Sequence, residues 1–371
     1  MHYFDHNATS PMCEAARRVW LEAVDRFPAN PSSPHRLGAR ADHALSEARD
    51  RLAGCLGVKA HEIIWTSGAT ESNNLLLHHA ATASEGEVWV SALEHPCVLA
   101  AAQHWLASRV RQIPATANGD VDLDWIYDHL RERRPALVGV MAANNETGII
   151  PSWRAVANAC REQGVPFFTD AAQAIGKEII PDLATANYFS GCAHKFGGPP
   201  GVGFLRASGP LTPLLFGGSQ EDGRRAGTEN VPGALSCAAA LEQRIAELKK
   251  RPPAERALVR DRFEHLLVKA LPDIQVLGHS VSRLWNTSAL LMPVVDCRRR
   301  WVVRLDKRGF AVSTGSACSS GKERPSHVLQ AMKLDGEGER MLRVSGGWET
   351  PDPLWEALAD AIIETAKEFK A

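Results

Sequence analysis

The chain has 371 residues, of which 44% are apolar and 23% charged, and its formal net charge is −1. These proportions are ordinary for a globular protein, and the charge lacks the basic surplus that nucleic-acid binding requires, so we expect no direct nucleic-acid partner. No run of eighteen apolar residues could cross a membrane, and the start of the sequence shows no secretion signal. The eight cysteines are scattered without a CxxC pair, which predicts reduced thiols, no metal site and a cytoplasmic location.

The length exceeds what one hydrophobic core usually supports, so we expect two domains behind a short amino-terminal arm. The clearest break is Arg251-Pro-Pro253, where two prolines interrupt a long helical pattern that begins at Val231. We therefore expect an arm over residues 1–12, a large domain over 13–252 and a small domain over 253–371.

Helix and strand patterns alternate through the expected large domain. Helices are predicted over 11–27 and 36–56, and a strand over 62–66 then leads through a small-residue turn into a helix that ends near 83. Further strands follow at 87–92, 135–143, 165–169, 188–193 and 202–206, with helices at 122–134 and 152–163. This alternation predicts an α/β protein with a mostly parallel sheet covered by helices.

The remaining third of the chain mixes strands at 274–277 and 287–292 with a helix at 296–309 and a helix that closes the chain. Between these helices lies a loop of small residues, 313–321, which carries the single thiol of Cys318. We expect these elements to form a smaller α+β domain.

Polar residues follow several of the predicted strands: Thr70, His95, Asn145, Asp170 and Lys195. Open α/β sheets bind their ligands at the carboxyl ends of the strands, so these side chains are expected to share one site.

Lys195 follows His194 and precedes a turn with four glycines and two prolines, which fixes the backbone around it. A lysine buried there would have a lowered pKa, as an amine that forms a Schiff base requires; the alternative is a surface lysine beside a loop.

The turn over 67–74 opens a helix and would expose free amide groups to an anion, although simple helix capping explains its Ser and Thr residues equally well. An amine, an anion site and the carboxylate of Asp170 together suggest pyridoxal phosphate, whose ring nitrogen a carboxylate keeps protonated. His95 could cover one face of the ring, or it could be an ordinary surface histidine.

Seven short motifs, in order, carry a family resemblance: Thr66-Ser-Gly-Ala-Thr-Glu-Ser72, Glu94-His95, Asn144-Asn-Glu-Thr-Gly148, Thr169-Asp-Ala-Ala-Gln173, Ala193-His-Lys195, Arg225-Ala-Gly-Thr-Glu-Asn230 and Gly315-Ser-Ala-Cys318. With them the chain resembles the cysteine desulfurases of the NifS/IscS branch, in aminotransferase class V. The resemblance implies the fold-type I architecture, with a seven-stranded large-domain sheet, a small domain that carries the cysteine loop, and an arm that packs on that domain.

The resemblance also implies a role for each matching residue. Lys195 would form the Schiff base and move the substrate α-proton, His95 would stack on the ring and shuttle protons, and Arg343 would clamp the substrate carboxylate. The remaining positions would hold pyridoxal phosphate: Ala69, Thr70 and His194 at the phosphate, Thr228 at the phosphate from the other subunit of a homodimer, Asp170 at the ring nitrogen, and Asn145 (also near the substrate) and Gln173 at the ring hydroxyl.

Cys318 defines the implied reaction. Its thiolate would attack the sulfur of L-cysteine, alanine would leave, and a persulfide would remain on Cys318 for a scaffold or carrier protein, as in iron–sulfur cluster assembly. Free cysteine is only slightly ionised at neutral pH, so a nearby cation or proton acceptor is expected. The alternative for Cys318 is a buried, inert thiol.

Three residues depart from the family pattern. Cys192 stands where a serine usually binds the phosphate, and a thiol is the weaker donor. His6 occupies a position that is commonly asparagine, and Trp348 one that is commonly basic or polar. These changes bear on cofactor affinity and on the choice of substrate or partner.

Other readings of the same scaffold remain open: a selenocysteine lyase, a class V aminotransferase that makes no use of Cys318, or a non-catalytic homologue that acts as a binding partner.

Overall fold

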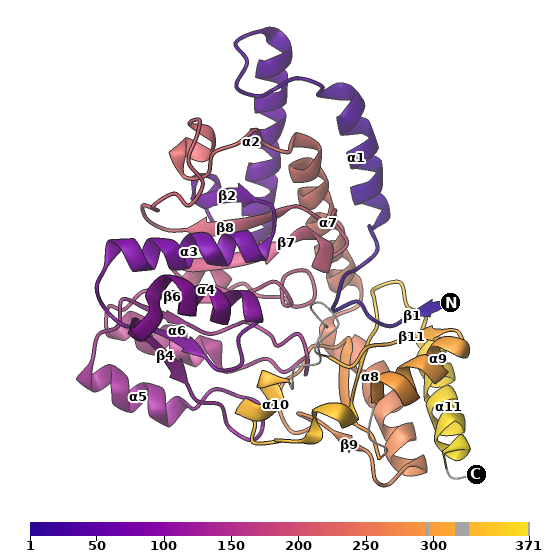
Figure 1. The fold of residues 1–371 in the computed structure, drawn as a ribbon. Helices are drawn as coiled ribbons and strands as arrows, with labels where there is room; N and C mark the ends of the chain where they lie inside the picture. The colour runs from indigo at the N-terminus through magenta and orange to yellow at the C-terminus, as the bar shows by residue number, and fades with distance from the viewer. Residues whose placement is uncertain (294–296, 316–325, 370–371) are drawn as a thin grey trace.

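The computed structural model describes residues 1–293, 297–315 and 326–369 (Figure 1). Its largest sheet has seven strands in the order β2-β8-β7-β6-β5-β3-β4. Only β8 runs antiparallel to its neighbours in this sheet, and the other adjacent pairs are parallel. The bounds are β2 (Ile63–Thr66), β3 (Val88–Ser91), β4 (Val110–Ile113), β5 (Leu137–Gly139), β6 (Phe167–Asp170), β7 (Tyr188–Cys192) and β8 (Gly203–Ala207). The predicted mostly parallel sheet is confirmed.

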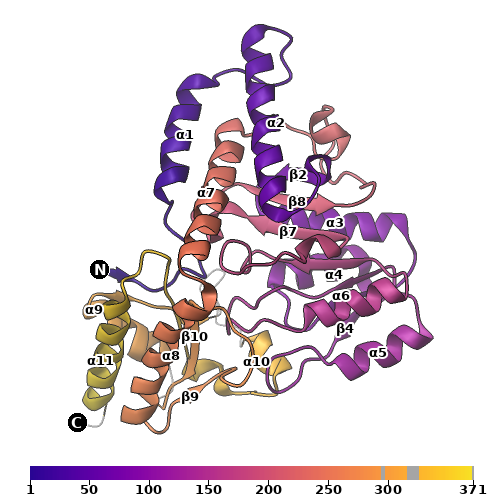
Figure 2. The same cartoon turned by 180° about the vertical axis from the view of Figure 1, so that it is seen from behind.

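Helices cover both faces of this sheet, as Figures 1 and 2 show from opposite sides. One face packs against α3 (Ala69–Ala83) and α4 (Pro96–Leu106), and the other against α5 (Leu123–Glu132), α6 (Trp153–Glu162) and α7 (Val231–Lys250). Successive side chains of a strand point to opposite faces of the sheet. Phe168 therefore packs in the core under α3 and α4, and Phe167 packs in the core under α5, α6 and α7. Two further helices, α1 (Glu14–Arg26) and α2 (Arg36–Leu56), pack on α7 and extend beyond the sheet.

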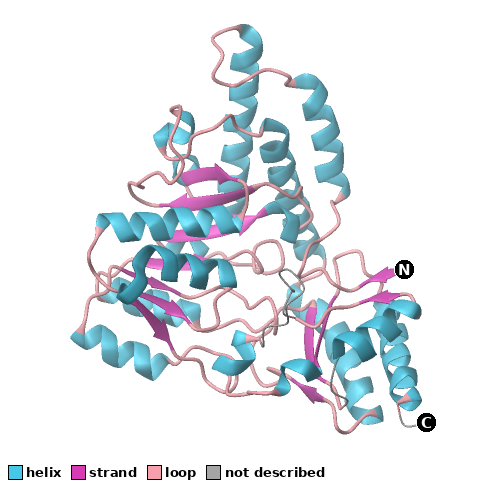
Figure 3. Cartoon of the chain, viewed as in Figure 1, coloured by secondary structure: helices cyan, strands magenta, loops and turns pink. Residues whose placement is uncertain are grey.

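The carboxyl-terminal part is built on an antiparallel sheet of three strands, in the order β12-β10-β9, with helices packed beside it (Figure 3). Its buried residues, among them Phe263, Leu290 and Trp355, form a core of their own. The bounds are α8 (Pro253–Ala270), β9 (Gln275–Val276), β10 (Thr287–Leu291), α9 (Val303–Lys307), α10 (His327–Ala331), β12 (Met341–Ser345) and α11 (Asp352–Glu368).

The amino-terminal arm lies against this second core. Its strand β1 (His2–Tyr3) pairs in parallel with β11 (Phe310–Ala311), and Phe4 is fully buried among the carboxyl-terminal residues. The arm then crosses to α1, so residues 5–10 lie between the two cores. The helix break at Arg251 and Pro252 separates α7 from α8, and we keep a domain boundary near residue 252 as a proposal. Across the described ranges, no helix has the length and apolar character needed to span a membrane.

Candidate active site

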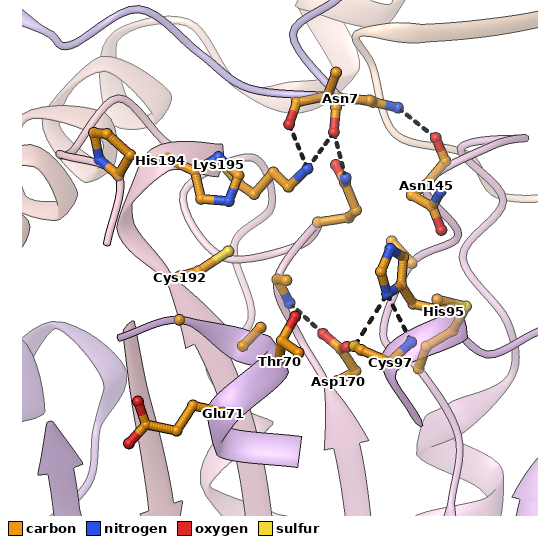
Figure 4. A pocket seen from close by; sticks show the side chains of 18 of the residues that line it. Asn7, Thr70, Glu71, His95, Cys97, Asn145, Asp170, Cys192, His194 and Lys195 are labelled. Atoms are coloured by element: carbon orange, nitrogen blue, oxygen red, sulfur yellow. Dashed lines mark hydrogen bonds between the residues drawn. The ribbon is translucent and has the colours of Figure 1, made fainter. Parts of the chain in front are cut away.

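A pocket of about 420 Å³ lies at the carboxyl ends of the parallel strands, where β6 and β7 end beside the start of α3 (Figure 4). Its volume falls in the range of small-molecule sites. Most of the residues selected from the sequence line it: Ala69, Thr70, His95, Asn145, Asp170, Gln173, Cys192, His194, Lys195 and Arg343. Thr228 is exposed and lies outside the pocket of its own chain, and Cys318 falls outside the described residues.

Lys195 comes three residues after the end of β7, and its amine points across the pocket toward the amino-terminal arm (Figure 4). Its Nζ donates to the main-chain oxygens of Asn7 and Ala8, at 2.6 and 2.7 Å. Burial lowers the pKa of Lys195, and the Arg343 guanidinium acts in the same direction. A larger share of the amine is therefore neutral at physiological pH, which is the form that reacts with an aldehyde.

Asp170 is the last residue of β6 and is 5% exposed. One oxygen, Oδ2, accepts from Asn73 Nδ2 at 2.8 Å, and the other, Oδ1, accepts from the Ala172 amide at 3.0 Å. The sheet and α3 thus fix an acceptor in the pocket. A carboxylate so held favours a cationic partner such as a protonated ring nitrogen.

The start of α3 forms another side of the pocket. Its N-cap is Gly68, which has no side chain to cap the first amides of the helix, and the Ala69 amide meets the Cys192 sulfur, a weak acceptor that an anion can displace. The strand β8 approaches this turn so closely that a Cβ on Gly203 would lie 2.4 Å from Gly68 Cα. The tight backbone packing keeps the turn, and with it the amides, in one position.

His95 caps the start of α4, which the sequence analysis did not predict. The Cys97 amide donates to His95 Nδ1 at 3.2 Å, and the Cys97 thiol lies 3.0 Å from the same nitrogen. Nδ1 is therefore an acceptor, and the proton of the neutral ring is assigned to Nε2. Burial lowers the pKa of His95, so the neutral ring prevails. Cys97 was missed as a site residue, although its place two residues after His95 was a usable signal.

Arg343 reaches the pocket from β12 and is 2% exposed. Its Nη2 donates to Asp5 Oδ1 at 2.6 Å, and its Nη1 donates to the main-chain oxygens of Asn145 and Gly315 at 3.0 Å each. Within the described ranges, its Nε is buried without a hydrogen-bond partner. The guanidinium is held in place and still has a donor to offer, which suits it to a carboxylate ligand.

Two of the three departures from the family pattern lie outside the pocket. His6 packs on Gly347, where a Cβ would come within 2.1 Å of the imidazole ring, and burial lowers the His6 pKa to about 3. Trp348 donates from Nε1 to the Gly176 oxygen, and the Arg244 guanidinium lies 4.2 Å from its ring centre. Both residues pack the arm and the turn after β12 onto the protein. Only the third departure, Cys192, faces the pocket.

The groups in this pocket fit pyridoxal phosphate. The cofactor requires an amine for its aldehyde, a carboxylate for its ring nitrogen and donors for its phosphate. Lys195, Asp170 and the first amides of α3 are such groups, and they face one cavity.

The comparisons with known proteins agree with this chemistry. The model of the aminotransferase class-V family matches residues 2–350. A cysteine desulfurase of Gluconacetobacter diazotrophicus is 39% identical over 343 residues, which are 90% of this chain and 84% of that protein. The cysteine desulfurase IscS of Dictyoglomus turgidum is 36% identical over 90% of this chain and 86% of its own. A solved NifS-like protein superposes with a TM-score of 0.88 at 29% identity, over 99% of both chains. The chain therefore belongs to the cysteine desulfurases of aminotransferase class V, which depend on pyridoxal phosphate.

Proposed function

We propose that the pocket at Lys195 binds pyridoxal phosphate and L-cysteine, and that the sulfur of the substrate is transferred to Cys318. The observation that carries this proposal is the convergence of a buried amine, a fixed carboxylate, helix amides without a side-chain cap and a buried guanidinium on one cavity. The relatives named cysteine desulfurase support the reaction, because they match over most of the chain.

The cofactor would be held at both ends by residues that the structure brings together. Ala69, Thr70, His194 and Cys192 line the pocket near the start of α3, where its phosphate would bind. Asp170 would pair with the ring nitrogen, and Asn145 and Gln173 would approach the ring hydroxyl. When bound, pyridoxal phosphate supplies an electron sink for the bonds at the substrate α-carbon.

The residues of the chain would then divide the work on the substrate. Arg343 binds the carboxylate of cysteine, and Lys195 moves the proton at its α-carbon. His95, neutral and protonated on Nε2, would cover one face of the cofactor ring and shuttle protons. The Cys318 thiolate attacks the substrate sulfur, so that the carbon–sulfur bond breaks, a sulfur–sulfur bond forms and alanine leaves.

Homodimer formation is part of the proposal. Thr228 lies on an exposed segment outside the pocket of its own chain, where it is free to contact the phosphate of a second subunit. The persulfide on Cys318 would pass to an acceptor protein, such as an iron–sulfur scaffold or a sulfur carrier. A cytoplasmic location follows from the scattered cysteines of the sequence and stays a prediction.

The test is to load the purified protein with pyridoxal phosphate, add L-cysteine and a thiol reductant, and measure alanine and sulfide together. Equal release of both is expected from the wild type. Cys318→Ala should abolish sulfide release, and Cys55→Ala, which changes a thiol outside the pocket, should leave it unchanged. A Cys318→Ala variant that still releases sulfide at the wild-type rate would refute the role of this thiol. A wild type that releases no alanine would refute the reaction.

A further inference from the structure

The free amine of Lys195 rests on the amino-terminal arm. Its Nζ donates to the main-chain oxygens of Asn7 and Ala8, which are consecutive acceptors on the same side of the pocket (Figure 4). A neutral amine has two N–H donors and one lone pair. Two fixed acceptors use both donors, and the direction of the lone pair is then fixed as well.

Asn7 is itself held by contacts from three parts of the chain. Its Oδ1 accepts from Lys177 Nζ at 2.9 Å and from Asn286 Nδ2 at 3.2 Å, and its Nδ2 donates to Thr287 Oγ1 at 2.9 Å. Its main-chain oxygen accepts from Gln173 Nε2 at 2.9 Å in addition to Lys195. Asn7 therefore joins the arm to the turn after β6 and to the start of β10.

Lys177 is the unusual member of this cluster. It is 0% exposed, and its Nζ donates to two amide oxygens, Asn7 Oδ1 and Gln173 Oε1. Within the described residues, no carboxylate forms an ion pair with it. Burial lowers its pKa, and Lys195 and Arg343 act in the same direction.

A buried amine without a counter-ion is costly, and an apolar side chain of similar length would fill the same space at less cost. This free-energy cost has a physical explanation if the hydrogen bonds of Lys177 hold residues of the site in place. Trp285 Nε1 donates to the main-chain oxygen of Lys177. This hydrogen bond does not involve the Lys177 side chain, so it does not explain why the position carries an amine.

We propose that the main-chain oxygens of Asn7 and Ala8 form an acceptor cradle that orients the free Lys195 amine, and that Lys177 is the positioning residue that holds this cradle through the Asn7 side chain. The proposal rests on the proposed function, in which Lys195 moves the α-proton of the substrate. It adds that the arm, and not only the turn that carries Lys195, sets the direction of the amine.

Three variants test the cradle: Lys177→Met, Asn7→Ala and the double substitution. The control is Arg206→Met, which breaks a buried ion pair between β8 and Glu62 and touches nothing in the pocket. Thermal unfolding of all four proteins shows how much of any effect is a loss of stability, and both assays below are normalised to folded protein.

The first assay needs no cofactor. The apoprotein is treated with an amine-acylating reagent, and modification of Lys195 is followed by peptide mass spectrometry. The cradle engages both N–H groups of the neutral amine, and an amine that loses these fixed acceptors can turn toward the reagent, so Lys177→Met should be modified about tenfold faster than the wild type. Arg206→Met should be modified at the wild-type rate.

The second assay measures alanine formation by the loaded enzyme. Lys177→Met and Asn7→Ala should each lower kcat about 10- to 100-fold, with KM within about threefold of the wild-type value, because the substrate still binds but the amine is misdirected. The double variant should lose no more than the worse single variant, since Lys177 acts through Asn7.

The proposal would be overturned if both single variants lost stability but kept the wild-type acylation rate and kcat. Losses in kcat that add up in the double variant would also overturn it. If Lys177→Met does not fold, Asn7→Ala tests the cradle by itself through the same two assays. A failure of the proposed function is distinguishable, because the wild type would then make no alanine while the acylation assay still reports on the cradle.

Discussion

Replacing Cys192 with Ser alters by a single atom the end of the pocket where we propose that the phosphate binds. Cys192 ends β7, is 3% exposed and lines the pocket beside the start of α3. Burial raises its pKa to about 11, so the thiol is neutral and can offer a phosphate only a weak S–H donor. The serine hydroxyl is a stronger donor in the same place. Cys192→Ser should therefore bind pyridoxal phosphate more tightly.

The magnitude follows from two opposing contributions. A hydrogen bond from a hydroxyl to a charged phosphate oxygen stabilises the complex by about 1.5–3 kcal/mol. The S–H donor of Cys192, which the hydroxyl replaces, already supplies roughly 1 kcal/mol of this in the wild type. We expect the dissociation constant of the cofactor to fall about tenfold, which corresponds to about 1.4 kcal/mol.

The assay is titration of the apoprotein with pyridoxal phosphate, followed by the visible absorbance of the bound cofactor, together with urea unfolding of the apoprotein. Cys160→Ser is the matched control, because Cys160 is 0% exposed on α6 and lies outside the pocket. The control should lose stability and keep the wild-type dissociation constant. An unchanged or weaker affinity in Cys192→Ser would refute the placement of the phosphate beside this residue.

Three further predictions concern the packing around the arm. His6 is buried with a pKa of about 3, so below about pH 6.5 the unfolded state binds a proton that the folded state does not. The free energy of unfolding therefore falls between about pH 6.5 and pH 3, by up to about 1.4 kcal/mol per pH unit. His6→Asn should flatten this slope, as measured by urea unfolding of the apoprotein between pH 7 and 5. Gly347→Ala should destabilise the protein by about 2–4 kcal/mol because its Cβ meets the His6 ring, and His6→Asn in the same chain should recover part of the loss in thermal unfolding; an equal loss in both backgrounds would contradict the clash. Trp348→Ala should lower the free energy of unfolding by about 3–5 kcal/mol, because packing and the contact with Arg244 are lost. The kcat per folded holoenzyme should stay near that of the wild type. A large fall in kcat would show that Trp348 acts on the site.

Most strands of the central sheet could be predicted from the sequence, because they are short apolar runs between turn residues. The sequence was insufficient for β4 and α4. The β4 strand has Arg111 and Gln112 at its centre and lies at the edge of the sheet, so it shows no apolar run. The α4 helix begins at Pro96, directly after His95, whose pattern indicated a ring-stacking residue or an ordinary surface histidine but not a helix cap.

The candidate site was predictable where its residues follow strands, because parallel strands deliver their carboxyl ends to one edge. Asn7 was missed for the opposite reason. Its partners Lys177 and Thr287 are 170 and 280 residues away in the chain, and no local pattern reports such contacts. The effect of His6 was equally hidden, since it depends on the space that Gly347 leaves for the ring.

The most direct measurement of the central claim is a single turnover of the loaded enzyme with L-cysteine and no reductant, followed by alkylation and peptide mass spectrometry. We predict that the peptide with Cys318 gains the mass of one sulfur atom, in the same molar amount as the alanine formed. Alanine without added sulfur on Cys318, or added sulfur on another cysteine in a Cys318→Ala variant that still turns over, would contradict the account.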